Sequence, residues 1–318
     1  MVKECSIGNV KLKNNLFLAP MAGVTDKAFR KICAQMGAGL VYTEMVSAKG
    51  IVYNDKKTLD LIECDIENMP RAVQIFGSEP TVIFDAIQKI DKYADIIDIN
   101  MGCPVPKIVS NGEGSALLKQ PNLIGQIVKK AVEATKKPVT VKMRIGWDDN
   151  SINVVDIAKI VQDNGAAAIT VHGRTRQDFY SGISRWQYIK DVKENVNIPV
   201  IGNGDVKDYI TFEKMINETG VEAVMVGRAA LGNPFVFRNI LSKGKKVEVT
   251  KEELLNTILK HYMLEVEYKG EYTAIREMRK HICWYIKGLP NNSEVKNLIN
   301  MSDNLDEVLD ILKQYLSI

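Results

Sequence analysis

Cys103 is the residue of this 318-residue chain whose type and position favour chemistry most clearly. It lies in the segment NMGCP (100–104), directly after an apolar stretch that predicts a strand. A free thiol has an ordinary pKa of about 8.5, so at neutral pH it is mostly protonated and can donate a proton. The other four cysteines favour packing roles, because two lie in predicted helices and two lie far from predicted strand ends (Cys33 and Cys283; Cys5 and Cys64).

Two more polar side chains, Lys142 and His172, interrupt apolar stretches that predict strands. A lysine inside a barrel can form a Schiff base, clamp an anion or donate to a heteroaromatic ring, unless a core carboxylate satisfies it. His172 can act as a base, donate to a phosphate or be a satisfied core histidine. Its place in the segment HGR (172–174), in a chain with only three histidines, favours a functional role.

Glycine-containing segments end two further predicted strands, as GNGD (202–205) and as Gly227 followed by Arg228. Backbone N–H groups beside glycine can approach an anion closely, and an arginine adds a charge-assisted hydrogen bond. These two segments therefore predict a phosphate site. The alternative is that the glycines only serve tight turns.

The elements that carry these residues alternate regularly between strand and helix. Short β-branched runs predict eight strands, at 16–19, 40–43, 72–76, 96–100, 139–144, 168–172, 200–202 and 223–226. Amphipathic stretches between them predict helices, among them 26–36, 81–91, 123–135, 154–163 and 208–218. Eight such units predict an α/β fold of the (β/α)₈ TIM-barrel type, with its sites at the carboxyl ends of the strands. A doubly wound sheet is the alternative, but no GxGxxG segment follows the first strand.

The pattern of predicted strands and helices changes after residue 241. A polar linker (LSKGKKVEVT, 241–250) is followed only by helical patterns, at 251–268, 271–287, 293–300 and 305–316. We therefore expect a barrel domain over residues 1–241 and a small all-α C-terminal domain over residues 242–318.

Composition excludes several classes of protein. The chain is 46% hydrophobic and 25% charged, which excludes a disordered, collagen-like or disulfide-scaffold protein. The cysteines and histidines form no cluster with metal-ligand spacing, so we expect no metal. No apolar run is long enough to span a membrane, and the start has no secretory signal, so we expect a cytoplasmic protein. The net charge of +3 (42 basic and 39 acidic residues) decides nothing about a nucleic-acid partner.

Taken together and in order, the motifs resemble those of the tRNA-dihydrouridine synthases, specifically the bacterial B-type branch. The segments that carry the resemblance are 19–26 (APMAGVTD), 74–77 (QIFG), 100–104 (NMGCP), Lys107, 112–118, 142–144 (KMR), 172–174 (HGR), 202–205 and 227–228.

The resemblance implies an FMN cofactor in the mouth of the barrel and NADPH or NADH as the reductant. It implies contacts to the flavin ring from Pro20, Met21, Ala22 and Gln74, and contacts to the ring or the ribityl phosphate from Lys142 and His172. It assigns the phosphate to Asn203, Gly204, Asp205, Gly227 and Arg228. NADPH and NADH stay equal alternatives, because no separate dinucleotide motif is visible.

The resemblance also implies the reaction, reduction of the C5–C6 bond of specific tRNA uridines to 5,6-dihydrouridine. A hydride from flavin N5 goes to C6, and Cys103 gives a proton to C5. Asn100, Arg144 and Arg174 are assigned to the substrate, and the uridine must be extruded from the folded RNA to reach the barrel.

The tail adds a candidate RNA surface on the predicted helix 271–287. Arg276, Arg279 and Lys280 fall on one side of this helix, next to an apolar side, and we expect them to contact tRNA phosphates. The alternative for this helix is an ordinary solvated amphipathic surface. For the whole chain, the alternatives are a flavin barrel acting on a free pyrimidine or other small enone, a non-catalytic RNA-binding protein, and an aldolase-type barrel that uses Lys142.

Overall fold

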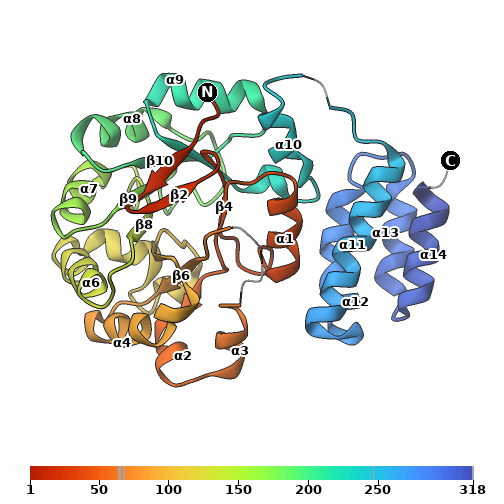
Figure 1. Cartoon of the computed structure of the whole chain (residues 1–318), viewed down its shortest axis with the longest axis horizontal. Helices are drawn as coiled ribbons and strands as arrows, with labels where there is room; N and C mark the ends of the chain where they lie inside the picture. The colour runs from red at the N-terminus through yellow and green to blue at the C-terminus, as the bar shows by residue number, and fades with distance from the viewer. Residues whose placement is uncertain (64–65, 67–68, 246, 317–318) are drawn as a thin grey trace.

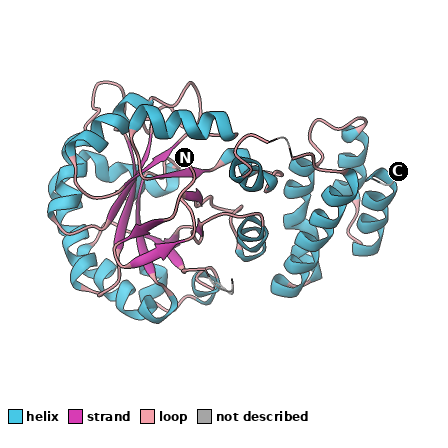
Figure 2. Ribbon diagram, turned by 45° about the horizontal axis from the view of Figure 1, so that its top comes forward, coloured by secondary structure: helices cyan, strands magenta, loops and turns pink. Residues whose placement is uncertain are grey.

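The computed structural model describes residues 1–63, 66, 69–245 and 247–316, so Cys64 lies outside the described residues. Its larger part is a curled parallel sheet surrounded by helices, and a bundle of helices stands at one side (Figures 1 and 2). No helix of the described residues has the length and apolar character needed to cross a membrane.

The barrel sheet has the strand order β4-β3-β11-β10-β9-β8-β7-β6-β5, and every neighbouring pair is parallel. The predicted (β/α)₈ fold is therefore confirmed, and most strand ends agree with the predicted ones to within two residues. The strands are β3 (Leu16–Leu18), β4 (Leu40–Val41), β5 (Val46–Ser47), β6 (Ala72–Phe76), β7 (Ile96–Met101), β8 (Val139–Arg144), β9 (Ala168–His172), β10 (Val200–Asn203) and β11 (Ala223–Val226).

The second strand of the barrel differs from its prediction, because it is split into β4 and β5. β4 pairs with β3, and β5 pairs with β6. Between them, Tyr42 forms a parallel bridge with Ala72, and the Thr43 N–H donates to the Ala72 carbonyl over 3.0 Å. This segment closes the sheet into a barrel, so neither piece is a free edge.

Helices cover the outside of the sheet because each buries one apolar face against it. Asp26 caps the first helix by accepting from the Phe29 N–H over 2.9 Å, and Asp208 forms a capping box at α9. The barrel helices are α1 (Lys27–Gln35), α2 (Ala48–Val52), α3 (Lys56–Asp60), α4 (Pro80–Ile90), α5 (Pro106–Val109), α6 (Pro121–Glu133), α7 (Val154–Asp163), α8 (Trp186–Asn195), α9 (Tyr209–Thr219) and α10 (Phe235–Leu241), with 3₁₀ turns at Asp91–Tyr93, Gly114–Lys119 and Arg228–Ala230.

An N-terminal hairpin was not predicted. Its strands β1 (Cys5–Ile7) and β2 (Val10–Leu12) are too short to show a period, and Cys5 lies within a strand rather than far from one. Ile7 and Leu12 share a buried cluster with residues near the starts of the barrel strands. The hairpin therefore closes the amino-terminal end of the barrel, where Figure 1 shows it lying across the strands.

The tail is a bundle of four helices: α11 (Lys251–Lys269), α12 (Glu271–Tyr285), α13 (Asn292–Met301) and α14 (Leu305–Leu316). The helical C-terminal region is confirmed, and its ends agree with the predicted ones to within two residues. It has its own apolar core, which includes Ile258, Met278 and Leu312. α11 packs against α1 of the barrel. The division into domains at residue 241 stays a prediction.

Candidate active site

A cavity of about 930 Å³ opens at the carboxyl ends of the barrel strands. Its size is at the upper end of the range for small-molecule sites. Most of the predicted site residues line it, namely Pro20, Met21, Ala22, Gln74, Asn100, Cys103, Lys142, Arg144, His172, Asn203, Gly204, Asp205, Gly227 and Arg228.

The backbone around Cys103 is held on both sides. Its N–H and that of Gly102 donate to the Asn100 side-chain oxygen over 2.9 and 3.0 Å, and its carbonyl accepts from the Ser115 N–H and hydroxyl over 3.0 and 2.9 Å. Gly114 has a φ of +58°, and a Cβ there would lie 2.8 Å from the Cys103 carbonyl oxygen, so glycine allows this close approach. The thiol is therefore carried on a rigid loop at the cavity wall.

The protonation state of Cys103 suits an acid. Burial raises the pKa of its thiol, and a backbone N–H at Val105 and the charges of Arg144 and Lys142 oppose this rise. The net shift is upward, so the thiol keeps its proton at neutral pH. The neighbouring cations stabilise the thiolate that remains after the proton leaves.

Buried polar side chains of β6, β7 and β8 form a chain of hydrogen bonds near Cys103. Asp98 accepts from the Gln74 amide nitrogen over 2.6 Å and from the Thr140 hydroxyl over 2.5 Å. The Gln74 amide oxygen accepts from Asn100 over 2.8 Å. Burial raises the pKa of Asp98 to about 6, and its hydrogen bonds and the charge of Lys142 limit that rise. Gln74 therefore has partners inside the protein, although the sequence assigned it to the flavin.

Lys142 lines the cavity and forms no ion pair with any residue that the structure describes. Burial, followed by the charge of Arg144, lowers the pKa of its amine to about 8, although Asp98 opposes this shift. At neutral pH the amine is mostly protonated, so it can donate hydrogen bonds to a ligand. An unpaired cation in a cavity wall favours an electron-rich or anionic ligand.

His172 is neutral. Burial lowers the pKa of its ring well below the ordinary value, and the nearby charges of Lys142, Arg144 and Arg174 lower it further. Its Nε2 lies 3.4 Å from an Arg174 nitrogen. Because a guanidinium can only donate, we assign Nε2 as the acceptor and place the proton on Nδ1.

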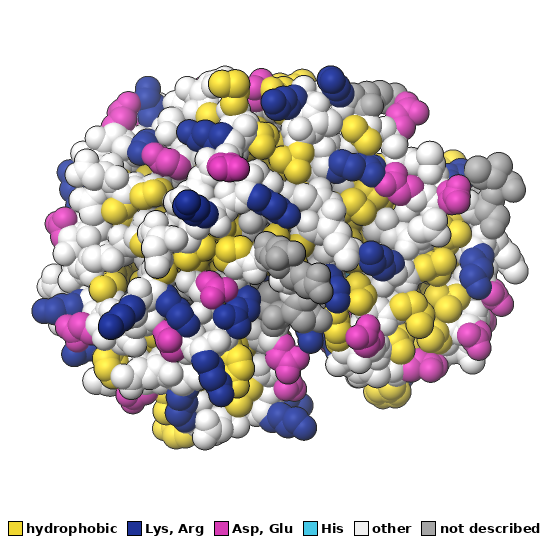
Figure 3. Space-filling view, viewed as in Figure 1, with side chains coloured by type: hydrophobic (Ala, Val, Ile, Leu, Met, Phe, Trp, Pro, Cys, Tyr) yellow, Lys and Arg dark blue, Asp and Glu magenta, His cyan; other side chains and the backbone are white. Residues whose placement is uncertain are grey.

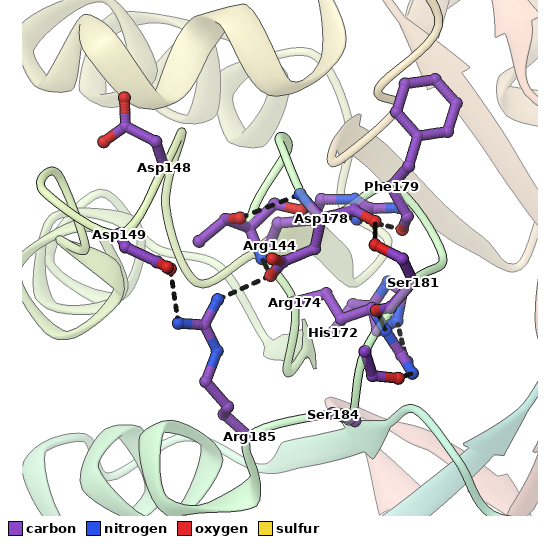
Figure 4. A network of polar contacts seen from close by, with 12 residues as sticks. Arg144, Asp148, Asp149, His172, Arg174, Asp178, Phe179, Ser181, Ser184 and Arg185 are labelled. Carbon is purple, nitrogen blue, oxygen red and sulfur yellow. Dashed lines mark hydrogen bonds and ion pairs between the residues drawn. The ribbon is translucent and has the colours of Figure 1, made fainter.

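Arg144 and Arg174 bind backbone carbonyls of the loop after β9, as Figure 4 shows. Arg144 donates to the carbonyls of Gly102, Thr175 and Phe179 over 2.7–2.9 Å. Burial lowers the pKa of its guanidinium to about 10, so it stays charged at neutral pH. Arg144 lines the cavity as well, and its side chain therefore ties the Cys103 loop to the loop at Phe179.

Arg174 is placed differently from its prediction as a substrate contact. It is only 1% exposed and is not among the described residues that line the cavity. It donates to the carbonyls of Ser181 and Gly182 over 2.9 and 2.7 Å and pairs with Asp205 over 2.8 Å. In this structure it holds a loop and does not face the cavity.

The predicted phosphate segments lie together at the ends of β10 and β11. Asp205 has a φ of +58° and accepts from Arg174, from Arg228 over 2.9 Å and from the Ser184 N–H over 2.7 Å. These partners lower the pKa of Asp205 although burial opposes the shift. Asp205 is the only carboxylate among the described lining residues, and it is paired. The cations that line the cavity are Lys142, Arg144, Lys207, Lys214 and Arg228.

Several lining residues were missed by the sequence prediction. They include Tyr180, Trp186, Lys207 and Lys214 from the barrel and Trp284 from the tail. Trp284 stands four residues after Lys280 on α12, so the spacing places both on one helical face. That spacing was the available signal, but only the docking of α12 on the barrel brings Trp284 to the cavity.

The three predicted RNA contacts of α12 do not share one free surface. Arg279 pairs with Asp303 over 2.8 Å, and Arg276 lies 3.5 Å from the same carboxylate. Lys280 instead lies toward the barrel, since a Cβ on Gly23 would be 3.9 Å from its ammonium. On the face drawn in Figure 3, basic and acidic side chains are interspersed.

A second buried cluster joins α1 to the tail. Asp26, His261 and Glu265 bring one possible metal ligand each within 4.8 Å of one another. The Lys269 ammonium lies 2.8 Å from Asp26 and 2.9 Å from Glu265, so a cation already lies beside both groups, and burial next to Asp26 raises the pKa of Glu265 to about 9. The absence of a metal stays a prediction.

Comparison with known proteins gives a consistent picture. A family model described as dihydrouridine synthase (Dus) matches residues 17–317. The chain is 41% identical to a "Probable tRNA-dihydrouridine synthase" of Rickettsia bellii, over 97% of each chain. It is 41% identical to a "tRNA-dihydrouridine synthase B" of Vibrio vulnificus, over 97% of this chain and 98% of the relative.

Solved structures support the fold. A structure described as "TcOYE with pHBA" matches with a TM-score of 0.58 and 12% identity, covering 79% of this chain and 95% of that one. Histamine dehydrogenase from Rhizobium sp. 4-9 matches with a TM-score of 0.62 and 12% identity, covering 82% of this chain and 50% of that one. The family match and the similarity to relatives over nearly the whole length place this chain in the dihydrouridine synthase family.

Proposed function

We propose that this protein reduces the C5–C6 double bond of a tRNA uridine to 5,6-dihydrouridine, with FMN in the barrel cavity and NADPH or NADH as the reductant. The observation that carries the proposal is a thiol on a rigid loop, at the wall of a cavity rich in hydrogen-bond donors. Burial raises the pKa of this thiol, which keeps it protonated at neutral pH. The activity named for relatives that are about 40% identical supports it.

The lining of the cavity fits an anionic heteroaromatic group. The cations Lys142 and Arg228 and the neutral His172 would hold FMN, together with Asn203 and the backbone at Gly204. Alanine and methionine side chains at the ends of β3 and β11 add apolar contacts. When bound, a reduced flavin supplies a hydride to the substrate.

The residues of the chain would then orient the uracil ring and donate the proton to it. Cys103 gives its proton to C5, and its thiolate is left beside the charges of Arg144 and Lys142. Arg144 and Asn100 line the same cavity and would orient the carbonyl edges of the ring. An extruded uridine would fill the mouth of the cavity and exclude water from the acid.

The tail would bind the rest of the RNA. Lys280 is placed between the tail and the barrel mouth, whereas Arg276 and Arg279 share Asp303 and would reach phosphates from farther out. We assign Arg174 a positioning role, because its guanidinium is committed to Asp205 and the loop at Ser181. A tRNA substrate would place the protein in the cytoplasm.

The test is to measure dihydrouridine by mass spectrometry in tRNA treated with the FMN-loaded protein and NADPH or NADH. We expect Cys103→Ala to lose about 100-fold or more of the rate, which is the contribution of a general acid, while flavin content stays normal. Cys5→Ala is the matched control, since Cys5 lies in the hairpin at the opposite end of the barrel. An unchanged rate in Cys103→Ala, or equal turnover of free uridine, would contradict the proposal.

A further inference from the structure

Asp98 stands at one end of a buried chain of hydrogen bonds whose other end is the backbone of Cys103. Asp98 faces Gln74 across the β6–β7 pair and Thr140 across the β7–β8 pair. Gln74, Asp98 and Thr140 are fully buried, and Asn100 is 8% exposed. The chain runs from Asp98 to Gln74 over 2.6 Å, to Asn100 over 2.8 Å and to the Cys103 N–H over 2.9 Å.

The direction of each bond follows from the first one. An ionised carboxylate can only accept, so Asp98 requires that Gln74 turn its NH₂ group toward it. The Gln74 oxygen must then face Asn100 and accept a hydrogen bond from the Asn100 NH₂ group. The Asn100 oxygen is left to accept from the N–H groups of Gly102 and Cys103. A reversed amide at either position would set two donors or two acceptors against each other at buried side chains.

The loop that results is fixed at further points. The Gly102 carbonyl accepts from Arg144 over 2.9 Å, and the Cys103 carbonyl accepts from Ser115. These bonds hold the carbonyl side of the loop, while the amide chain alone holds its N–H side among the described contacts. Asp98 does not line the cavity, and its hydrogen bonds reach the Cys103 backbone through the two amides, while its charge acts separately on Lys142.

We propose that Asp98 is a positioning residue that orients the amides of Gln74 and Asn100 and thereby fixes the backbone of Cys103 at the cavity wall. This inference rests on the proposed function for the role of Cys103 as an acid. It assigns Asp98 no contact with substrate or flavin. It does not require the carboxylate charge itself, only an acceptor directed at Gln74.

The variants distinguish the loss of a hydrogen-bond acceptor at position 98 from the loss of the carboxylate charge. Asp98→Leu removes the acceptor and the charge, whereas Asp98→Asn keeps an oxygen for Gln74 and can donate to Thr140. Thr140→Val is the matched control, because it removes the other partner of Asp98 and leaves the chain to Cys103 intact. Asp98→Ala replaces Asp98→Leu if the leucine variant does not give folded, flavin-containing protein.

The first measurement is the rate at which tRNA reoxidises the reduced flavin of each full-length holoprotein, beside the rate of flavin reduction by NADPH. We expect Asp98→Leu to slow reoxidation by about 10- to 100-fold and to change flavin reduction by less than twofold. Asp98→Asn and Thr140→Val should both stay within about threefold of the parent. Equal losses in Asp98→Leu and Asp98→Asn would overturn the proposal, since charge would then be what matters.

The second measurement is a double-mutant cycle. If Asp98 acts through Asn100, Asp98→Leu should add little to the loss caused by Asn100→Ala, so the two effects should be far from additive. Additive losses would overturn the proposal.

The third measurement is independent of catalysis. Labelling of Cys103 by iodoacetamide, followed by peptide mass spectrometry because Cys5 and Cys283 are also partly exposed, reports its placement directly. A change of about threefold or more in Asp98→Leu but not in Asp98→Asn supports the proposal, and unchanged labelling overturns it. If Cys103→Ala kept full activity, the proposed acid would fail while this labelling result still decided the role of Asp98.

Discussion

Two lysines of this molecule are both partly buried but have opposite environments. Lys142 lies in the wall of the barrel cavity without an ion-pair partner among the described residues, and burial lowers the pKa of its amine to about 8. Lys269 lies between the barrel and the tail and pairs with Asp26, Glu265 and Glu277 over 2.7–2.9 Å. Burial opposes its charge too, but these carboxylates outweigh it and raise the pKa of Lys269.

The difference distinguishes a cavity that can bind a ligand from a contact that holds the tail against the barrel. Around Lys269 the ammonium is compensated by Asp26 and Glu277, and burial next to Asp26 raises the pKa of Glu265 to about 9, so this third carboxyl group stays protonated at neutral pH. Around Lys142 the cations outnumber the carboxylates, and the only carboxylate among the described lining residues, Asp205, is already paired. Charge left uncompensated at a cavity wall costs stability unless a ligand supplies the partner. The two lysines should therefore respond to replacement in opposite ways.

The largest expected effect is the loss of stability in Lys269→Met. Removing this ammonium leaves the Asp26 and Glu277 carboxylates without their counter-charge between α1 and the tail, and such a loss typically costs about 3 kcal/mol. Chemical denaturation should show this decrease in the free energy of unfolding. Lys260→Met is the control on the same helix, since Lys260 is exposed, and it should change stability by less than about 0.5 kcal/mol. A Lys269→Met protein as stable as the parent would contradict the stabilising role of Lys269.

The next effect is a loss of flavin affinity in Lys142→Met. A charged donor to a ligand is worth roughly 2 kcal/mol, so we expect FMN to bind the apoprotein about 30-fold more weakly. The free energy of unfolding of the apoprotein should not fall, because the folded state already disfavours this charge relative to the unfolded chain. Titration of the apoprotein with FMN and denaturation of the same sample measure both quantities. A lower free energy of unfolding with unchanged FMN affinity would show that Lys142 stabilises the fold and does not bind FMN.

The pH dependence of FMN affinity sharpens the same contrast. Because the amine of Lys142 has a pKa of about 8 without ligand, binding above that pH must take up a proton. Affinity should fall with rising pH above about 8, at a slope of at most about tenfold per unit. The profile of Lys142→Met should be flat between about pH 8 and 9.5, and that of Lys142→Arg should also lack the fall, since an arginine stays charged. An identical slope in all three proteins would assign the titration to another group.

The sequence predicted the cavity far better than the interface. Cys103, Lys142 and His172 could be placed because each follows or interrupts a strand, and a closed barrel brings all its carboxyl strand ends together. Their grouping needed only the fold class, which the alternation of strands and helices indicates.

What the sequence did not predict depends on register and docking. Gln74 faces Asp98 because of the β6–β7 register, which side-chain periodicity alone does not define. Arg174 was assigned to the substrate, but the loop at Ser181 folds back and takes up its donors. Trp284 lines the cavity only because α12 docks on the barrel, and that docking depends on the buried groups around Lys269, which are far apart in sequence.

The smallest expected effects divide the basic residues of α12 in the same way as the two lysines. Lys280 faces the barrel mouth and has no ion pair with a described residue, so Lys280→Ala should weaken tRNA binding about threefold to tenfold and lower the salt slope by about one. Arg279 donates to the Ser302 carbonyl and pairs with Asp303, so Arg279→Ala should change tRNA affinity by less than about twofold and cost about 1 kcal/mol of stability.

Binding measured at several salt concentrations, with flavin content as the control for the barrel, separates the two residues. Replacing Arg276, Arg279 and Lys280 together with Ala should weaken binding only modestly beyond Lys280→Ala. Equal losses from Lys280→Ala and Arg279→Ala would mean that the RNA displaces Asp303 from its arginines. In that case the whole basic side of α12, and not only the part beside the cavity, would be the phosphate-binding surface.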